Sequence, residues 1–336
     1  MSRFKQTAEF YNFVCHFGQF ELLDFVEPIV IPAFHKTGKV REWGKSAYFL
    51  LDVQLTVLRA GNQRHPAIVG RFVVDTELSR AQVFEEGRLR GSPRTMKTAP
   101  SSVFALLLDN HKLLFAKEVS GGPGIGAFRT TIELLFNRQR LDYVQSLYEQ
   151  AKTQKEEDGR SERVSKKSLF ESIPRADVKI LPLLGESGIR DFLARFTVLR
   201  ELQIRVIKPN NELDNDELFD DLQKARENVN AESTTLVHRN SEGLKKAAAA
   251  KQAHPAMQGN AIVRFSGVGA NAEKLSGTND DFKVVSQPIE LPRHVKDSGT
   301  LMLNVFTGML TEGLIRISEG RLSAANTEKL RKILER

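Results

Sequence analysis

The sequence predicts an α+β protein, in which a mainly antiparallel sheet with packed helices is followed by a β-α-β-α-β-β layer. Up to about residue 120, short apolar runs alternate with turn residues, as in antiparallel sheets. Further along, strand-like runs alternate with helical patterns. The charged stretch 156–168 separates the two parts. We therefore expect a β-rich domain at 1–155, a linker at 156–168, and an α+β domain with a C-terminal helix at 169–336.

The strands of the first region are expected from apolar runs between turn signals. Pro28 and Pro32 flank part of the second run, so a strand there is an edge strand or is broken. Together the runs predict an antiparallel sheet of roughly five or six strands. The expected strands are Tyr11–Phe17, Leu22–Ile31, Ala47–Leu58, Ala67–Asp75, Gln82–Arg90, and the hairpin of Val103–Leu108 and Lys112–Glu118.

Two helices close this region, at Ala127–Phe136 and Leu141–Lys155. The first carries one apolar stripe, because Phe128, Ile132 and Phe136 recur at helical spacing. We expect that stripe to pack on the sheet.

Strands and helices alternate in the second region. Leu199–Ile207 alternates apolar and polar residues, as a half-buried strand does. The expected strands are Leu169–Ile173, Val178–Leu184, Leu199–Ile207, Thr234–His238, Asn260–Ser266 and Phe282–Pro288. The expected helices are Ile189–Phe196, Asp214–Val229, Glu242–Ala253, Leu301–Leu310 and Ser323–Arg336.

The composition is that of a globular protein with a moderate positive charge. The 336 residues are 40% hydrophobic and 27% charged, and the formal charge is +7. Such an excess is compatible with a polyanionic partner such as nucleic acid. No apolar run approaches the ~20 residues of a membrane helix, and Met1–Phe10 does not resemble a signal peptide. The single Cys15 excludes an internal disulfide. We expect a cytoplasmic protein without a membrane partner.

A glycine-rich loop, Gly121–Gly126, lies between the hairpin and the first helix. Free amides at a helix N-terminus can bind phosphate, and Arg129 follows in the first helical turns. The loop is not a Walker loop, because Lys-Ser or Lys-Thr does not follow Gly126. Two interpretations stay open: a phosphate-binding loop, or a turn whose glycines return the helix to the sheet.

Basic residues are the broadest functional signal. Four of them crowd a segment that also contains Gly91, Ser92 and Pro93, which we expect to be a loop. Lys and Arg on such loops hold phosphate backbones without base recognition, although a solvated surface has the same composition. The expected nucleic-acid-binding residues are Arg88, Arg90, Arg94, Lys97, Gly122, Gly124, Gly126 and Arg129.

Two short patterns make nuclease chemistry an alternative. Asp177-Val178-Lys179 and Asp281-Phe282-Lys283 match the Asp-x-Lys arrangement of metal-dependent nucleases, at expected strand starts. The catalytic candidates are therefore Asp177, Lys179, Asp281 and Lys283, with Mg²⁺ as cofactor if this alternative holds. The alternative interpretation is that these are charged residues at strand edges, without a catalytic role. No cofactor or metal site is otherwise expected, and no histidine pair has metal-ligand spacing.

Three functions follow, in order of preference. The first is a sequence-independent, non-catalytic nucleic-acid-binding subunit of a larger intracellular assembly, of prokaryotic type and suited to defence against foreign DNA. The second is a Mg²⁺-dependent nuclease. The third is an assembly subunit that binds protein and no nucleic acid. We expect a protein partner or a homo-oligomer in addition to nucleic acid. The sequence does not separate DNA from RNA.

Overall fold

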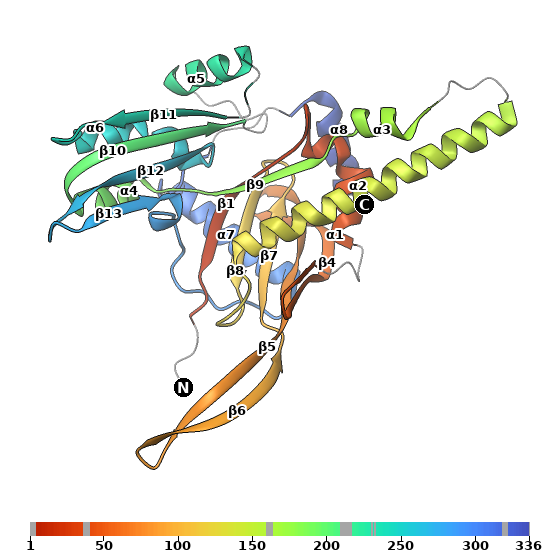
Figure 1. The fold of residues 1–336 in the computed structure, drawn as a ribbon. Helices are drawn as coiled ribbons and strands as arrows, with labels where there is room; N and C mark the ends of the chain where they lie inside the picture. The colour runs from red at the N-terminus through yellow and green to blue at the C-terminus, as the bar shows by residue number, and fades with distance from the viewer. Residues whose placement is uncertain are drawn as a thin grey trace.

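The computed structural model describes residues 5–35, 41–158, 164–208, 217–229, 231, 233–317 and 322–335. Helices and strands are both abundant, and two antiparallel sheets form the frame (Figure 1). The α+β class predicted from the sequence is therefore confirmed. A bilayer-crossing helix is absent from these ranges, since none of their helices combines sufficient length with an apolar composition. The division into domains stays a prediction.

Within the ranges given above, the larger sheet has nine strands in the order β2-β1-β8-β7-β5-β4-β3, with β6 paired to β5 and β9 paired to β1. All of these pairs are antiparallel. The strands are β1 (Ala8–Phe17), β2 (Phe20–Glu21), β3 (Arg41–Trp43), β4 (Ser46–Ala60), β5 (Gln63–Glu85), β6 (Arg88–Thr98), β7 (Ser101–Leu107), β8 (Lys112–Lys117) and β9 (Ala176–Pro182).

Both faces of the central part of this sheet are covered, so the strands there are apolar on both sides. Phe13 and Phe104 belong to the core on the face of α2 (Ile125–Asp158). Phe10 and Leu58 belong to the core on the opposite face, with Phe306 of α7 (Val295–Thr311). Because successive residues of a strand point to opposite faces, the near-continuous apolar runs of β1, β7 and β8 follow from this double burial.

The smaller sheet has the order β11-β10-β12-β13. Leu202 and Ile204 of β10 alternate with polar residues and pack with Val263 and Phe265 of β12, beneath two helices. The strands are β10 (Phe196–Ile207), β11 (Ser233–Arg239), β12 (Ala261–Gly269) and β13 (Lys274–Thr278). The helices that cover them are α4 (Glu186–Ala194) and α6 (Lys246–Gln252). A second sheet with helices is therefore present as expected, although two of the strands expected in it lie elsewhere.

The remaining described helical segments are η1 (Leu22–Phe25), η2 (Val26–Val30), α1 (Ile31–His35), α3 (Lys166–Ser172), α5 (Glu217–Asn228), η3 (His254–Gln258), η4 (Asn279–Asp281) and α8 (Ala324–Glu335). Several of them pack into the core on the face of α2, to which η1, η2 and α1 contribute Leu23, Ile29 and Phe34. The expected helix start at Asp214 lies outside the described residues, and α5 is described from Glu217.

Three expected strands are wrong. Leu22–Ile31 is helical (η1 and η2), because its buried residues recur at helical spacing, which suits packing against α2. Leu169–Ile173 lies in and just after α3, which Ser165 caps by accepting a hydrogen bond from the Ser168 amide at 3.0 Å. Phe282–Pro288 makes only isolated bridges, because the Phe282 ring packs into the smaller core.

Two further details differ from the expectation. The strand expected at Val178–Leu184 to open the C-terminal layer lies in the larger sheet as β9, where it pairs with β1. The two expected helices after the glycine loop form one continuous helix, α2, because no glycine or proline interrupts residues 127–158.

A hairpin of β5 and β6 stands clear of the body (Figure 1). β5 keeps its neighbour β4 as far as Asp75 and its neighbour β7 as far as Val73, and beyond these residues it pairs with β6 alone. Glu86 and Gly87 connect the two strands, with φ of 50° and 74°, as in a type I′ turn. We call the projecting part, Thr76–Thr98, the arm. The short strand expected at Gln82–Arg90 is therefore the tip of a longer hairpin.

Candidate nucleic-acid interface

Four of the predicted nucleic-acid-binding residues lie together on the arm. Arg88, Arg90, Arg94 and Lys97 all belong to β6 and are exposed. The expectation that they lie on a loop is wrong, because Gly91–Pro93 forms a β-bulge opposite β5 and the strand continues. A strand places each side chain on one of two faces, which a loop does not do.

The register of the hairpin sorts its side chains into two faces. Residues directly opposite one another share a face, and along β5 the faces alternate. The apolar face consists of the pairs Phe84–Leu89, Gln82–Gly91, Arg80–Arg94, Leu78–Met96 and Thr76–Thr98. The charged face carries the pairs Glu85–Arg88, Val83–Arg90, Ser79–Thr95 and Glu77–Lys97.

Cations on the charged face are balanced by acids. Arg88 and Lys97 lie opposite Glu85 and Glu77, and Arg90 forms an ion pair with Glu86 of the turn at 2.5 Å. Three cations therefore face three carboxylates. This balance weakens the attraction of the charged face for phosphate.

The apolar face has a different charge balance. Arg80 and Arg94 lie directly opposite one another, and no acid shares their face. Arg80 donates a hydrogen bond to the Ser92 hydroxyl at 3.1 Å. Like charges at directly opposed positions destabilise a hairpin, so this arrangement gains from an anion placed between or above the two guanidinium groups. The +2 net charge of the arm, five cations against three acids, resides on this face.

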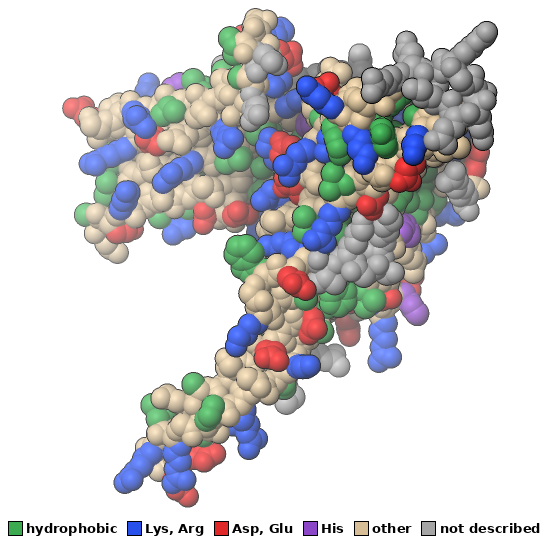
Figure 2. All heavy atoms as spheres, turned by 45° about the vertical axis from the view of Figure 1, so that its right-hand side comes forward, with side chains coloured by type: hydrophobic (Ala, Val, Ile, Leu, Met, Phe, Trp, Pro, Cys, Tyr) green, Lys and Arg blue, Asp and Glu red, His purple; other side chains and the backbone are tan. Residues whose placement is uncertain are grey.

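Large apolar side chains flank the arginine pair. Phe84 and Leu89 are 72% and 69% exposed near the tip, and Leu78 and Met96 are 56% and 61% exposed nearer the body. Figure 2 shows the arm projecting from the body, with hydrophobic, basic and acidic side chains exposed along it. Contiguous exposed apolar groups mark interaction sites more often than isolated ones do.

The glycine loop has a structural role at one of its positions. A Cβ on Gly122 would lie 2.5 Å from the Ser101 carbonyl oxygen, so only glycine fits there. The Ser102 hydroxyl donates to the Pro123 carbonyl at 2.8 Å and holds the turn on the sheet. These contacts support the interpretation of Gly122 as a turn that returns α2 to the sheet.

Gly124 and Gly126 are more open, and a Cβ on either would meet no atom within 4 Å. Gly126 and Arg129 both line a cavity of about 260 Å³ beside β9. Arg129 donates to Glu133 at 2.9 Å and to the Val178 carbonyl at 3.3 Å, so its guanidinium already has protein partners. The structure brings Gly126 and Arg129 together, but places them on the body and the four β6 residues on the arm.

The two Asp-x-Lys patterns lie in different environments. Asp177 and Lys179 form an ion pair with each other at 2.8 Å on β9, where Asp177 is 57% exposed. Asp281 accepts a hydrogen bond from the Thr278 amide at 2.7 Å as part of a helix cap.

Lys283 belongs to a separate cluster with Glu9 and Tyr11. Its ammonium lies 2.7 Å from the Glu9 carboxylate and 3.4 Å from the Tyr11 hydroxyl. Burial and the neighbouring Glu9 raise the pKa of Tyr11 far above its ordinary value. Within the described ranges, no three His, Cys, Asp or Glu side chains converge as a metal site would require. The geometry therefore favours neither pattern as a Mg²⁺ centre.

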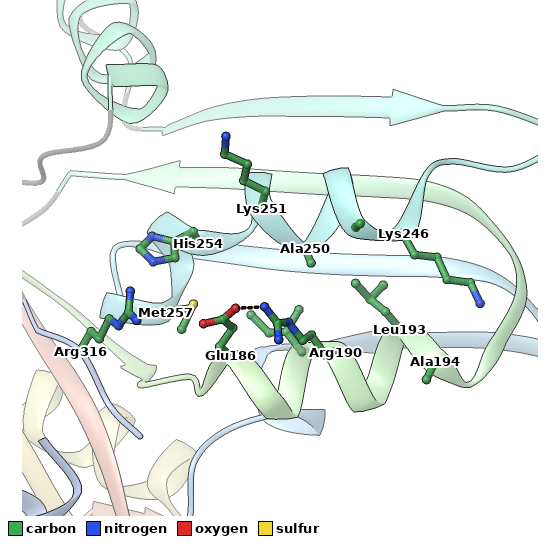
Figure 3. A pocket seen from close by; sticks show the side chains of 12 residues that line it. Glu186, Arg190, Leu193, Ala194, Lys246, Ala250, Lys251, His254, Met257 and Arg316 are labelled. Atoms are coloured by element: carbon green, nitrogen blue, oxygen red, sulfur yellow. Dashed lines mark hydrogen bonds and ion pairs between the residues drawn. The ribbon is translucent and has the colours of Figure 1, made fainter. Parts of the chain in front are cut away.

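A second candidate site is a groove between α4 and α6, with a volume of about 710 Å³ (Figure 3). Its apolar lining includes Ile189, Leu193 and Ala250. The small side chains of the alanine run in α6 leave the space that larger residues would fill.

The groove has a basic rim. Among the described residues that line the groove, Glu186 is the sole acid, and it pairs with Arg190. Lys246 donates a hydrogen bond to the Phe196 carbonyl. Figure 3 shows Arg316 and His254 at one end. The rim cations are Arg190, Lys246, Lys251 and Arg316. The groove therefore combines an apolar floor with an excess of positive charge.

The sequence interpretation missed Arg80 on the arm and Arg190 and Arg316 at the groove. Arg80 was detectable in principle, because reading Glu86-Gly87 as a hairpin turn places it close to Arg94. Arg190 and Arg316 are far apart in the chain, and no local pattern connects them.

No protein-family model matches this chain, and no curated protein is significantly similar to it.

Proposed function

We propose that this protein is a sequence-independent nucleic-acid-binding subunit of a larger assembly, and that the arm is its contact with nucleic acid. One observation carries the proposal. A two-stranded ribbon that stands clear of the body carries five Lys and Arg side chains and four large exposed apolar ones. Cations that contact phosphates supply affinity without base recognition, and a ribbon that projects from the body leaves these cations accessible to a phosphate backbone.

The arm also supports the role as a subunit. Two strands alone are marginally stable in water, and an exposed apolar stripe favours association. A free arm therefore gains from a surface that covers it. Binding to nucleic acid within an assembly provides such a surface.

The first test is a salt series of binding to labelled single- and double-stranded DNA and RNA, with and without Mg²⁺. The matched variant replaces Glu77–Lys97 with a short turn, which leaves both sheets of the body intact. We expect wild-type affinity to fall steeply with salt, and the armless variant to bind at least ~10-fold more weakly with an unchanged melting temperature. Equal binding by the two proteins, or no binding by the wild type at low salt, contradicts the proposal.

The samples of the same series that contain Mg²⁺ test the nuclease alternative. Cleavage that requires Mg²⁺, and that is lost in Asp177→Asn or Asp281→Asn, would place the nuclease hypothesis first. Binding with intact product favours the non-catalytic subunit.

A cytoplasmic location and a role in prokaryotic defence against foreign DNA belong to the same proposal. Contacts that ignore sequence suit a protein that meets DNA of unknown sequence. Cells that express the wild type or the armless variant, challenged with phage, test this role. Equal phage yields with both proteins would contradict the role in defence.

The groove favours a second function, docking onto a protein partner. Its apolar floor and basic rim are complementary to an acidic amphipathic helix, which binds through residues at i, i+3, i+4 and i+7. Ala250→Trp fills the floor, and Arg316→Glu reverses charge at the rim. Both are expected to weaken binding of a designed Leu/Glu helix, whereas its Leu/Lys counterpart should not bind the wild type. Equal binding of the two peptides contradicts this docking mode.

A further inference from the structure

We infer that the arm binds single-stranded nucleic acid through its apolar face alone, with Arg80 and Arg94 on phosphates and the flanking apolar pairs against exposed bases. The inference rests on the proposed function, since it assumes that the arm contacts nucleic acid. It assigns the binding to one face and names the class of nucleic acid.

Charge selects the face. Every cation of the charged face has an acid opposite it or in the adjacent turn, so a phosphate that approaches it also approaches Glu77, Glu85 or Glu86. Arg80 and Arg94 have no acid on their face. A phosphate between them replaces a repulsion with two charge-assisted interactions, and the planar guanidinium suits bidentate contact with phosphate oxygens.

The apolar pairs select the class of nucleic acid. Phe84–Leu89 and Leu78–Met96 lie on either side of the arginine pair on the same face. Bases of a single strand are free to pack on such side chains, and a base stacked on the aromatic ring of Phe84 contributes about 1–3 kcal/mol without regard to sequence. Inserting the same side chains into a duplex first requires unstacking, at a few kcal/mol per step. Single strands therefore bind this face without that cost.

The dimensions suit a short stretch of nucleotides. Phe84 and Leu78 are six residues apart on β5, which corresponds to roughly 20 Å at ~3.4 Å per residue. The cationic pair, Arg80–Arg94, lies between the two apolar pairs along this length, so bases and phosphates have separate contacts. We expect a site of a few nucleotides, comparable to small single-strand-binding modules.

The test uses two double variants that remove the same charge from opposite faces, Arg80→Gln/Arg94→Gln and Arg88→Gln/Arg90→Gln. Both lower the net charge of the arm by two, so a difference between them reports the face. The first is expected to weaken binding of a labelled single-stranded oligonucleotide at least ~10-fold. It should also reduce the slope of log K against log salt by about 1.4, the value for two single-strand phosphate contacts. The second is expected to change affinity less than ~3-fold.

Fluorescence adds a local readout. In a Trp43→Phe background, which removes the single native tryptophan, Phe84→Trp reports the apolar face and Val83→Trp reports the charged face. Single strands should quench the first reporter strongly and leave the second nearly unchanged. Melting temperatures close to that of the wild type verify that the variants are folded.

The outcomes separate this inference from the proposed function. If the wild type binds no nucleic acid, both this inference and the proposed function are contradicted. Binding that survives Arg80→Gln/Arg94→Gln but fails in Arg88→Gln/Arg90→Gln, or quenching at position 83 and not at 84, overturns the assignment of the face and leaves the proposed function standing. Tighter binding to duplex than to single strands overturns the class of nucleic acid.

Discussion

The two halves of β5 differ in what surrounds them, although one strand runs through both. Between Ala67 and Val73 the strand lies between β4 and β7 with helices over both faces of the sheet, and Ile68 and Phe72 are fully buried. Beyond Asp75 it pairs, within the described part of the chain, with β6 alone, and Leu78 and Phe84 are exposed. Apolar side chains stabilise the fold in the first half. In the second half they are available to a partner. The same residue types therefore have opposite roles, which their neighbours determine.

The largest expected effect comes from truncating one aromatic residue in the body, on the strand next to β5, and one on the arm. Phe104 on β7 is fully buried, with its ring 5.0 Å from that of Phe128 and 5.7 Å from that of Phe34. Phe104→Ala should lower the free energy of unfolding by about 3–5 kcal/mol. Phe84→Ala on the arm should change it by less than ~0.5 kcal/mol. Urea denaturation measures both, and similar losses would show that the arm is part of the cooperative core.

A loss of stability of similar size is expected when the pH falls, because the body contains the buried histidine His111. The arm contains no histidine, so it does not contribute to this pH dependence. Burial, followed by the charge of Lys112, lowers the pKa of His111 from 6.5 to about 4. Below pH 6.5 the unfolded chain takes up a proton that the folded chain does not. The stability contribution of the neutral imidazole is therefore lost as the pH falls from 6.5 to about 4, by about 3 kcal/mol in total.

His111→Asn provides the control for this pH dependence. Asparagine tolerates the φ of 54° at this position and does not titrate in the range. Subtracting its unfolding free energies from those of the wild type between pH 7 and 4 isolates the contribution of the histidine. A difference that stays constant with pH would contradict the lowered pKa.

A smaller effect on stability is expected from adding one methyl group in the body, at Gly70, and one on the arm, at Gly91. At Gly70 a Cβ would lie 2.9 Å from the Phe104 ring and 3.0 Å from a Val53 methyl group, so Gly70→Ala should cost about 1–3 kcal/mol. At Gly91 a Cβ would meet nothing within 4 Å, and Gly91→Ala should be neutral or stabilising by up to ~1 kcal/mol. Thermal unfolding distinguishes the two, and a large loss at Gly91 would mean that the arm packs on a surface.

Several elements could be predicted from local pattern alone. The apolar stripe of α2 and the alternation in β10 indicated their type, because periodicity reflects which side chains face the core. The hairpin of β7 and β8 was predicted from its turn and two apolar runs. Four basic residues of the arm form a recognisable group in the sequence, because they lie within ten positions of one another.

Other features depended on pairings between distant parts of the chain. β9 pairs with β1 across more than a hundred and fifty residues, and its own sequence suits either sheet. Leu22–Val30 has a composition that fits a strand, and its packing beside α2 decided in favour of helix. The position of Arg80 opposite Arg94 depended on recognising a two-residue turn that joins two long strands.

By itself, the sequence determined the α+β class, most element types and the existence of a basic segment near residue 90, because these depend on residues within a few positions of one another. Tertiary structure decided that this segment stands away from the body. It also decided which charges are balanced by acids and which apolar side chains stay exposed. Burial and charge pairing depend on neighbours brought together by the register of strands, and that register is set by long-range packing.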